Sequence, residues 1–306
     1  MTTFEESGPV RLSAIEAGSG EPVVLLHGSA SSNRQWRGLI EALYDRYHVI
    51  APDLIGYGET PSWPYGEHVG MADHARLLAD LVKRQGARLH IVGHSFGGAV
   101  ALRFAQEHPE RVQSLTLIEP VALHVLAGEH SEHRALLDDI RSVAAQMRRA
   151  EAEGDADGGV QHFVAFWNGQ AAWKSMRADL RTELASCSRA IIGDFDAIAD
   201  ETPGVAGFRG IEAPTLLLYG TRSPQVTIRI SKMLAETMPN AAARGIDGAG
   251  HMSPLSHGAT VNGLVAAHIA RHRAAWTVTS MSSPSKKRLP DARPTSSSPG
   301  STAGSA

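Results

Sequence analysis

Residues 88–98 read RLHIVGHSFGG, and the character of this stretch changes in its middle. The first half is an apolar run that is typical of a β-strand covered on both faces. The second half, GHSFG at 93–97, leads into small and apolar residues with a helical pattern that reaches about residue 108. A serine between glycines at a strand-to-helix junction predicts a sharp turn that exposes its hydroxyl beside a helix N-terminus.

Strand-like and helical patterns alternate on both sides of this turn. The strand-like runs are 10–15, 22–27, 47–51, 88–93, 112–118, 214–220 and 241–246. The helical patterns between and after them are 36–43, 72–85, 97–108, 227–238 and 262–273. This alternation predicts βαβ units, which form a mostly parallel sheet with helices on both faces because crossovers are right-handed.

The segment 121–210 has no strand-like run. It shows helical patterns over 131–153, 160–176 and 179–199, and a polar break, GDADGG, at 154–159. We therefore expect an all-helical lid inserted into the α/β core. The predicted parts are a first core segment (1–120), the lid (121–210), a second core segment (211–276) and a disordered tail (277–306) rich in Ser, Thr, Pro, Gly and Ala.

The composition is that of an ordinary globular protein. Its 306 residues are 42% hydrophobic and 20% charged, which excludes wholesale disorder. The formal net charge is −3, from 29 basic and 32 acidic residues, so electrostatics predicts neither a nucleic-acid partner nor an anionic membrane partner. The basic cluster at 286–288 is interpreted as solvated tail charge.

Several classes of site and location are disfavoured by the sequence. The single cysteine, Cys187, makes neither an intrachain disulfide nor a cysteine-rich zinc site. No apolar run approaches the roughly 20 residues that span a bilayer, and the polar, acidic N-terminus is unlike a secretory signal, so we expect a cytoplasmic protein. No phosphate loop, dinucleotide fingerprint or metal-ligand cluster is present, and no cofactor is expected.

Four motifs in order carry a resemblance to a known family. They are His27-Gly28 after a buried run, the turn DLIGYG at 53–58, the serine turn at 93–97, and Gly248-Ala-Gly250-His251 near the end. With these motifs the chain resembles the α/β-hydrolase superfamily over about residues 8–275. The resemblance implies a central sheet of about eight strands and a hydrolytic activity.

The family's roles carry over to matching positions. Ser95 resembles the nucleophile, and His251 resembles the general base that takes the serine proton and returns it to the leaving group. The backbone N–H groups of Phe96 and Ser29 match the two donors of the oxyanion hole. His94 is interpreted as structural, as is His257.

The acid of the catalytic triad departs from the family's pattern. Relatives place it on the loop after the penultimate strand, but here that loop, GTRSPQ at 220–225, has no carboxylate, and Ser223 stands at the usual position. Glu119 ends the strand next to the serine strand, an arrangement that resembles certain haloalkane dehalogenases, and we predict it to be the acid. The alternatives are that Glu119 only caps its strand and that Asp247 is the acid.

A few other residues are assigned from their positions. Asp53, with the glycines of its turn, is interpreted as structural. The expected pocket residues are Trp36, Phe166 and Trp167; lid aromatics also pack in cores, so that interpretation stays open. An aromatic and aliphatic lid over the serine favours an apolar acyl or alcohol group.

The serine argues against the dehalogenase and epoxide-hydrolase branches, which need an aspartate nucleophile. We expect a serine hydrolase that cleaves a small or medium, fairly apolar carboxylic ester, a small-molecule substrate, through an acyl-enzyme. The first alternative is hydrolysis of a C–C bond in aromatic meta-cleavage products, with Arg177, Arg181 or Arg189 holding the substrate carboxylate. The second is a non-catalytic ligand sensor on the same fold. The sequence does not specify the oligomeric state.

Overall fold

The computed structural model describes residues 10–64, 69–127, 130–201 and 204–273, and the predicted tail lies outside them. The described residues belong to one compact unit. Their strands are β1 (Ala14–Ala17), β2 (Glu21–Leu26), β3 (Tyr47–Pro52), β4 (Leu89–His94), β5 (Val112–Ile118), β6 (Thr215–Gly220) and β7 (Ala241–Ile246). Each strand-like run of the sequence therefore contains a strand, and the described residues form seven strands rather than about eight, because no further run pairs with the sheet.

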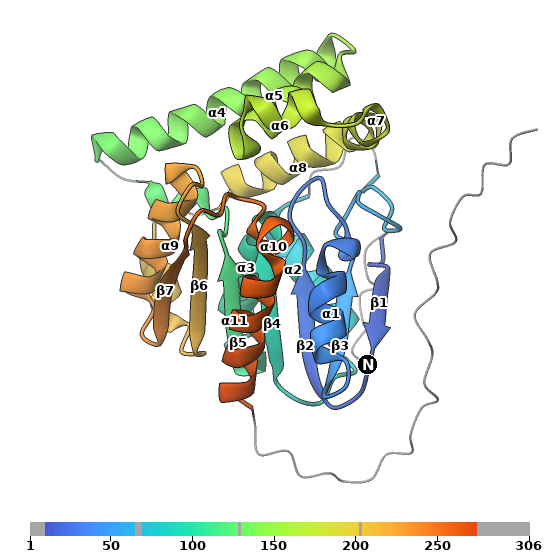
Figure 1. The fold of residues 1–306 in the computed structure, drawn as a ribbon. Coiled ribbons are helices and arrows are strands. Elements are labelled where there is room, and N and C mark those ends of the chain that lie inside the picture. The colour runs from blue at the N-terminus through green and yellow to red at the C-terminus, as the bar shows by residue number, and fades with distance from the viewer. Residues whose placement is uncertain (1–9, 65–68, 128–129, 202–203, 274–306) are drawn as a thin grey trace, which may run out of the picture. The chain divides into compact units, whose positions relative to one another are not determined.

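The strands form one sheet in the order β1-β3-β2-β4-β5-β6-β7 (Figure 1). All neighbours are parallel except β1, which runs antiparallel to β3 with Ala14 opposite Pro52. Every residue of β2 and of β4 is buried, as expected for strands covered on both faces. The serine turn therefore begins at the end of a central strand.

Helices cover both faces of the sheet, which confirms the predicted fold class (Figure 1). One face packs against α1 (Arg37–Leu43) and α11 (Gly258–Arg271), and the other against α2 (Met71–Val82), α3 (Phe96–Glu107) and α9 (Gln225–Thr237). The shorter helices of the core are η1 (Asn33–Trp36), η2 (Pro109–Arg111), η3 (Leu123–Leu126), η4 (Ala206–Gly210) and α10 (Ser253–Ser256).

The chain between β5 and β6 is helical and lies across one end of the sheet (Figure 1). Its long elements are α4 (Ser131–Ala152), α5 (Ala156–Asn168), α6 (Gln170–Ser175), α7 (Ala178–Ser186) and α8 (Ser188–Ala199). The predicted break is shorter than expected, because Asp155 caps α5 by accepting the N–H of Gly158 at 2.9 Å. Conversely, Gly169 adopts a φ of 83° and divides the second predicted helix in two.

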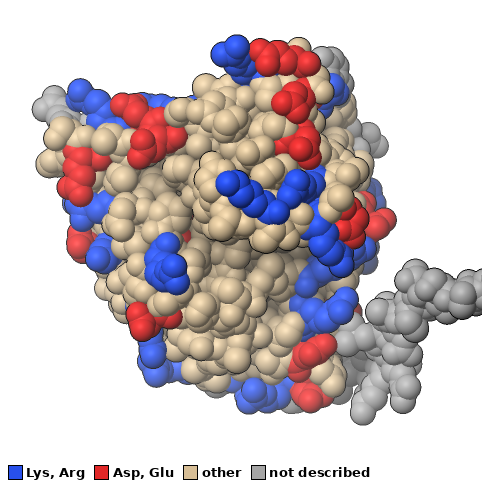
Figure 2. All heavy atoms as spheres, turned by 45° about the horizontal axis from the view of Figure 1, so that its top comes forward, with Lys and Arg blue, Asp and Glu red and all other residues tan. Residues whose placement is uncertain are grey.

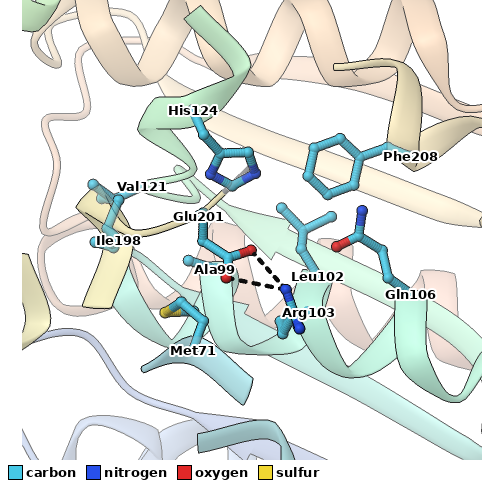
Figure 3. Close-up of a pocket in the computed structure, with 10 residues that line it drawn as sticks. All are labelled: Met71, Ala99, Leu102, Arg103, Gln106, Val121, His124, Ile198, Glu201 and Phe208. Atoms are coloured by element: carbon cyan, nitrogen blue, oxygen red, sulfur yellow. Dashed lines mark hydrogen bonds and ion pairs between the residues drawn. The ribbon is translucent and has the colours of Figure 1, made fainter. Parts of the chain in front are cut away.

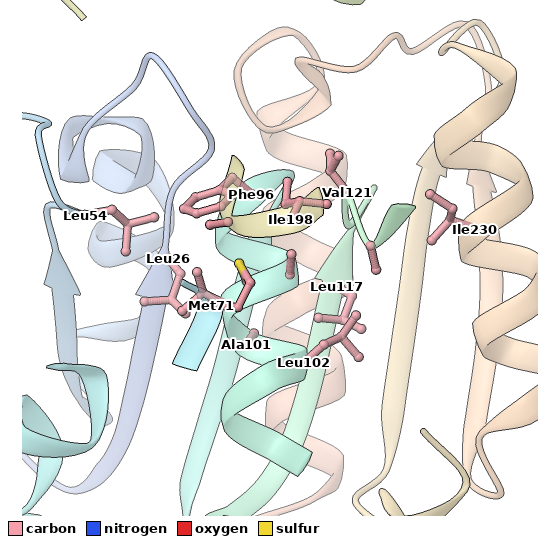
Figure 4. Packing of buried hydrophobic residues seen from close by; sticks show 14 of the residues in the cluster. Leu26, Leu54, Met71, Phe96, Ala101, Leu102, Leu117, Val121, Ile198 and Ile230 are labelled. Carbon is pink, nitrogen blue, oxygen red and sulfur yellow. The ribbon is translucent and has the colours of Figure 1, made fainter. Parts of the chain in front are cut away.

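These helices share a core with the sheet. Ile198 of α8 belongs to the same buried cluster as Phe96 of α3 and Val121 after β5 (Figure 4). The sheet and the helices from α4 to α8 are accordingly continuous in their packing, and the boundaries at 121 and 210 stay a prediction.

Acidic and basic side chains both occur along the helical face turned forward in Figure 2. Of the helices in the described part of the chain, none has the length and apolar character needed to cross a bilayer. The cytoplasmic location expected from the sequence stays a prediction.

Candidate active site

The serine turn is built by close backbone approach. Ser95 follows the last residue of β4, precedes α3, and adopts a φ of 55° and a ψ of −120°. A Cβ on Gly93 would lie 2.5 Å from the carbonyl oxygen of Gly97, and a Cβ on Gly97 would lie 2.3 Å from that of His27. Both positions therefore require glycine, and the packing holds the serine in its strained conformation.

Three side chains from distant parts of the chain form a hydrogen-bonded series. The Nε2 atom of His251 lies 3.0 Å from the Oγ atom of Ser95. Its Nδ1 atom lies 2.8 Å from Oε2 of Glu119. All three residues are buried, with exposed fractions of 6% for Ser95, 4% for His251 and 0% for Glu119. The structure thus brings together the serine, histidine and acid that the sequence singled out.

Glu119 is held as a carboxylate by several donors. Besides His251, the backbone N–H of Gly220 donates to it at 2.8 Å and the hydroxyl of Thr227 at 2.9 Å. Burial raises the pKa of Glu119, but the hydrogen bond and the attraction of His251, together with the bonds from Ser223 and Gly220, outweigh it and lower the pKa to about 2. An ionised acceptor on Nδ1 leaves Nε2 of His251 free to accept the serine proton.

Ser223 occupies the position where relatives carry their acid, and it supports Glu119 instead. Its hydroxyl donates to Oε1 of Glu119 at 2.6 Å. Asp247, the alternative acid, accepts a bond of 3.4 Å from the hydroxyl of Thr221 at an exposed site. The described residues contain no bond between Asp247 and His251, so the geometry favours Glu119.

Two backbone N–H groups beside Ser95 are available as donors. Phe96 is the first residue of α3, where an N–H has no partner within the helix. The N–H of Ser29 makes no hydrogen bond to another described residue. The ring of His27 fixes this loop, because its Nδ1 bonds the carbonyl of Gly28 at 2.7 Å and its Nε2 accepts the N–H of Leu54 at 2.9 Å.

Two rings fix the position of His251. His94 is buried, which lowers the pKa of its imidazole to about 3, so the neutral ring donates from Nε2 to the carbonyl of His251 at 2.9 Å. Trp167 of α5 stacks on the imidazole of His251, with ring centroids 4.3 Å apart. His94 and Trp167 therefore orient the imidazole of His251.

Other assigned residues have structural contacts. Asp53 accepts the backbone N–H groups of Asn33 at 2.7 Å and of Glu59 at 3.0 Å, so it ties two turns together. His257 contacts the hydroxyl of Ser256 at an exposed position.

A small cavity lies directly above the serine. It has a volume of about 10 Å³, room for a single water molecule. Its lining comes from the core and from helices α5 and α8: Ser29, Ser95, Phe96, Val121, Phe163, Trp167, Ile191, Asp194, Phe195 and Ile198. The cavity in this conformation is therefore smaller than an ester molecule.

The three expected pocket residues have different places. Trp167 lines the cavity, and Phe166 packs edge-on against Trp167 with ring centroids 4.8 Å apart. Trp36 is 1% exposed and belongs to the buried cluster shared by α1 and α11. The expectation for Trp36 is therefore wrong, because packing on the sheet face occupies its ring.

The arginines considered for binding a carboxylate are engaged elsewhere. Arg177 bonds Asp179 at 2.8 Å, Arg189 bonds Glu151 at 2.7 Å, and Arg181 lies over the ring of Trp173. None of the three lines the cavity at Ser95.

A neighbouring pocket between α3 and α8 contains a paired arginine. Arg103 bonds Glu201 at 3.1 Å (Figure 3). Glu107 also accepts a bond from Arg103. This pocket shares Val121 and Ile198 with the cavity at Ser95 but contains none of the three residues of the hydrogen-bonded series.

One acidic residue of the cavity was not found from the sequence. Asp194 of α8 is 4% exposed, and its Oδ2 accepts the hydroxyls of Ser29 at 2.5 Å and of Tyr57 at 2.7 Å. Burial raises the pKa of Asp194 to about 7, although the bonds from Ser29 and Tyr57 lower it. The carboxyl therefore titrates near neutral pH.

This pKa makes stability depend on pH. The native carboxyl binds a proton that the unfolded chain releases above about pH 4, so stability falls as pH rises toward 7. We expect the stability of Asp194→Asn not to fall in this way, because the amide does not titrate. The difference in unfolding free energy, variant minus wild type, should therefore increase by about 2 kcal/mol between pH 5 and pH 8. Urea unfolding at both pH values measures the change, and parallel pH profiles for the two proteins would contradict it.

The described residues hold no group of three or more His, Cys, Asp or Glu side chains placed to bind a metal ion.

Comparison with known proteins identifies relatives of this arrangement. The family model for the alpha/beta hydrolase fold matches residues 21–258. A thermophilic esterase from Thermogutta terrifontis, solved with malate bound, superposes with a TM-score of 0.67 at 25% identity, over 87% of this chain and 96% of that one.

Two of the curated relatives have different activities in their names. A 2-hydroxy-6-oxo-2,4-heptadienoate hydrolase from Pseudomonas putida is 36% identical over 38% of this chain and 44% of its own length. A pimeloyl-[acyl-carrier protein] methyl ester esterase from Chromobacterium violaceum is 28% identical over 78% of this chain and 91% of its own length. The chain spans less than half of the length of the first curated relatives that it matches.

Proposed function

Because the chain belongs to the alpha/beta hydrolase fold family, we propose that it is a serine hydrolase that cleaves a small or medium, apolar carboxylic ester. The observation that carries the proposal is the buried series of hydrogen bonds from Ser95 through His251 to Glu119. A serine activated by such a series is the arrangement that acyl transfer requires.

The first half of the reaction forms an acyl-enzyme. The Oγ atom of Ser95 attacks the ester carbonyl carbon while its proton passes to Nε2 of His251. Glu119 stabilises the imidazolium that results, since its carboxylate accepts the proton on Nδ1. The carbonyl oxygen becomes an alkoxide and binds the N–H groups of Phe96 and Ser29. Collapse breaks the C–O bond, and His251 gives its proton to the departing alcohol.

The second half returns the enzyme to its starting state. A water molecule takes the place of the alcohol and gives a proton to His251 as its oxygen attacks the acyl carbon. The bond to Oγ of Ser95 then breaks, the acid leaves, and the serine recovers its proton from His251. No group beyond water and the ester is consumed.

The composition of the cavity supports an ester of apolar character. Its walls are mainly Phe, Trp, Ile and Val, and no lysine or arginine is part of them. Hydrolysis of a C–C bond in a meta-cleavage product, the activity implied by the name of the Pseudomonas putida relative, is the second candidate. Such products carry carboxylates, and the described cavity lining has no cationic partner for one.

The test is turnover by the wild-type protein of p-nitrophenyl esters from two to eight acyl carbons, beside one aromatic meta-cleavage product. We expect turnover of the esters, with an acyl adduct on Ser95 detected by mass spectrometry after rapid acid quenching. Turnover of the meta-cleavage product alone would replace the ester proposal by C–C hydrolysis. Binding of these compounds without turnover would favour the ligand sensor.

A further inference from the structure

Asp194 is an ionisable group in the cavity that the proposed reaction does not use. Both of its hydroxyl donors, on Ser29 and Tyr57, bond the same oxygen, Oδ2. Among the described residues, no donor bonds Oδ1. The residue lines the cavity together with Ser95, so one acceptor atom of its carboxyl is left for a ligand.

Within the part of the chain that the structure describes, no cationic side chain bonds this carboxylate. The titratable groups around it on the neighbouring elements are Tyr57, Cys187 and His27. Burial is the main cause of the pKa shift in each of these groups. It raises the pKa of the Tyr57 phenol and of the Cys187 thiol, and it lowers the pKa of the His27 imidazole to about 4. All three side chains are therefore neutral near pH 7. His251, the remaining titratable group nearby, has its Nδ1 committed to Glu119. A buried carboxylate without a cation is costly, and a ligand that supplies the cation removes that cost.

Three aromatic side chains line the same cavity as Asp194. Phe163 and Trp167 of α5 and Phe195 of α8 line it, and Phe163 meets the other two rings edge-on at centroid distances of 6.2 and 6.1 Å. Aromatic faces attract ammonium groups, and they do so most strongly where water is excluded. A carboxylate beside such rings is the chemistry that recognises a substituted ammonium ion.

We propose that Asp194 determines substrate specificity by receiving a cationic ammonium group, so that the natural ester is that of an amino alcohol or of an amino acid with a charged nitrogen. The inference rests on the proposed function and narrows its substrate class to esters whose otherwise apolar body carries one ammonium group. It also disfavours dianionic substrates, since their charge would repel the carboxylate.

The test uses pairs of esters that share a shape and differ by one charge. On the alcohol side the pair is 2-(trimethylammonio)ethyl acetate and 3,3-dimethylbutyl acetate. On the acyl side it is the p-nitrophenyl esters of 4-(trimethylammonio)butanoate and 5,5-dimethylhexanoate. We expect the cationic member of at least one pair to have a kcat/KM about 10-fold or more above its neutral partner at pH 8.

The pH dependence of this ratio identifies the group responsible. Quaternary ammonium does not titrate, and His251 serves both members of a pair, so its protonation cancels in the ratio. The ratio should fall toward one as pH drops through about 7, because Asp194 becomes neutral. A ratio that stays constant from pH 5.5 to pH 8.5 would overturn the proposal without requiring any variant.

Asp194→Asn and a control two residues away complete the design. Asp194→Asn should abolish the preference and its pH dependence, so that the ratio of kcat/KM values within each pair lies near one from pH 5.5 to pH 8.5, as expected for loss of a charge contact. Asp196→Asn should keep both, because Asp196 is half exposed and paired with Arg148.

The outcomes separate the two proposals. Turnover of the neutral esters with ratios near one would overturn the inference and leave the proposed function standing. If Asp194→Asn lowered kcat/KM equally for both members of a pair, the residue would have a structural role, and this result would also overturn the inference. Absence of turnover for all four esters would overturn the proposed function, and the inference with it.

Discussion

Ser95→Ala is expected to lower kcat for p-nitrophenyl acetate by about 10⁴- to 10⁶-fold, the scale seen when a catalytic serine is removed. The loss follows because the substitution removes the Oγ atom that is hydrogen-bonded to His251 and is proposed to form the acyl-enzyme, while the N–H groups of Phe96 and Ser29 remain. Steady-state rates on purified protein, corrected for the spontaneous rate, measure the effect.

Two controls show whether a loss of activity in Ser95→Ala comes from the missing hydroxyl and not from misfolding. Alanine fits the strained turn as serine does, so the thermal midpoint of Ser95→Ala should lie close to that of wild type. Ser256→Ala, at an exposed hydroxyl of α10, should retain the wild-type rate. Equal rates for wild type and Ser95→Ala would exclude the proposed mechanism.

Glu119→Gln is expected to lower kcat by at least about 10²-fold, because a neutral amide does not stabilise the imidazolium of His251. An amide NH₂ group facing Nδ1 would also favour the tautomer of His251 that carries its proton on Nε2, and that tautomer cannot accept the serine proton. The matched comparison is Ser223→Ala, which removes one of the hydrogen bonds to the carboxylate and leaves the charge in place. Its rate should fall by less than about 10-fold, in proportion to one neutral hydrogen bond.

The order of the two effects tests the assignment. Stopped-flow measurement of the acylation burst separates formation of the acyl-enzyme from its hydrolysis, and Glu119→Gln should slow both, because His251 transfers a proton in each. A larger loss in Ser223→Ala than in Glu119→Gln would make Glu119 a strand cap, as in the alternative interpretation.

The parallel core could be predicted because its signals are local. A fully apolar run such as Val23 to Leu26 marks a buried strand without knowledge of its neighbours. The glycines at 93 and 97 indicate close backbone contacts, and the structure shows the carbonyl groups that they approach. The breaks at Gly169 and Cys187 were not predicted, because apolar residues continue on either side of them.

The acid of the site required reasoning about spatial neighbours. Glu119 could be singled out because adjacent parallel strands end at one edge of a sheet, so a residue after β5 lies near one after β4. The support from Ser223 and Thr227 depends on how the loop after β6 folds back on that edge, and no local pattern encodes it.

Asp194 could not be found in this way. It shares a helix with Asp196, and the sequence offers both as ordinary polar positions. Only the packing of α8 on the loops after β2 and β3 buries one of them and leaves the other half exposed. Burial of a charge is a tertiary property, so periodicity along one helix does not reveal it.

Asp194 lies on α8, one of the helices that cover Ser95. The same helix also supplies Ile191, Phe195 and Ile198, which close the space above Ser95. The carboxyl that is proposed to receive a ligand's charge and the apolar side chains that cover Ser95 therefore belong to one helix, which hydrogen bonds from Ser29 and Tyr57 tie to the core.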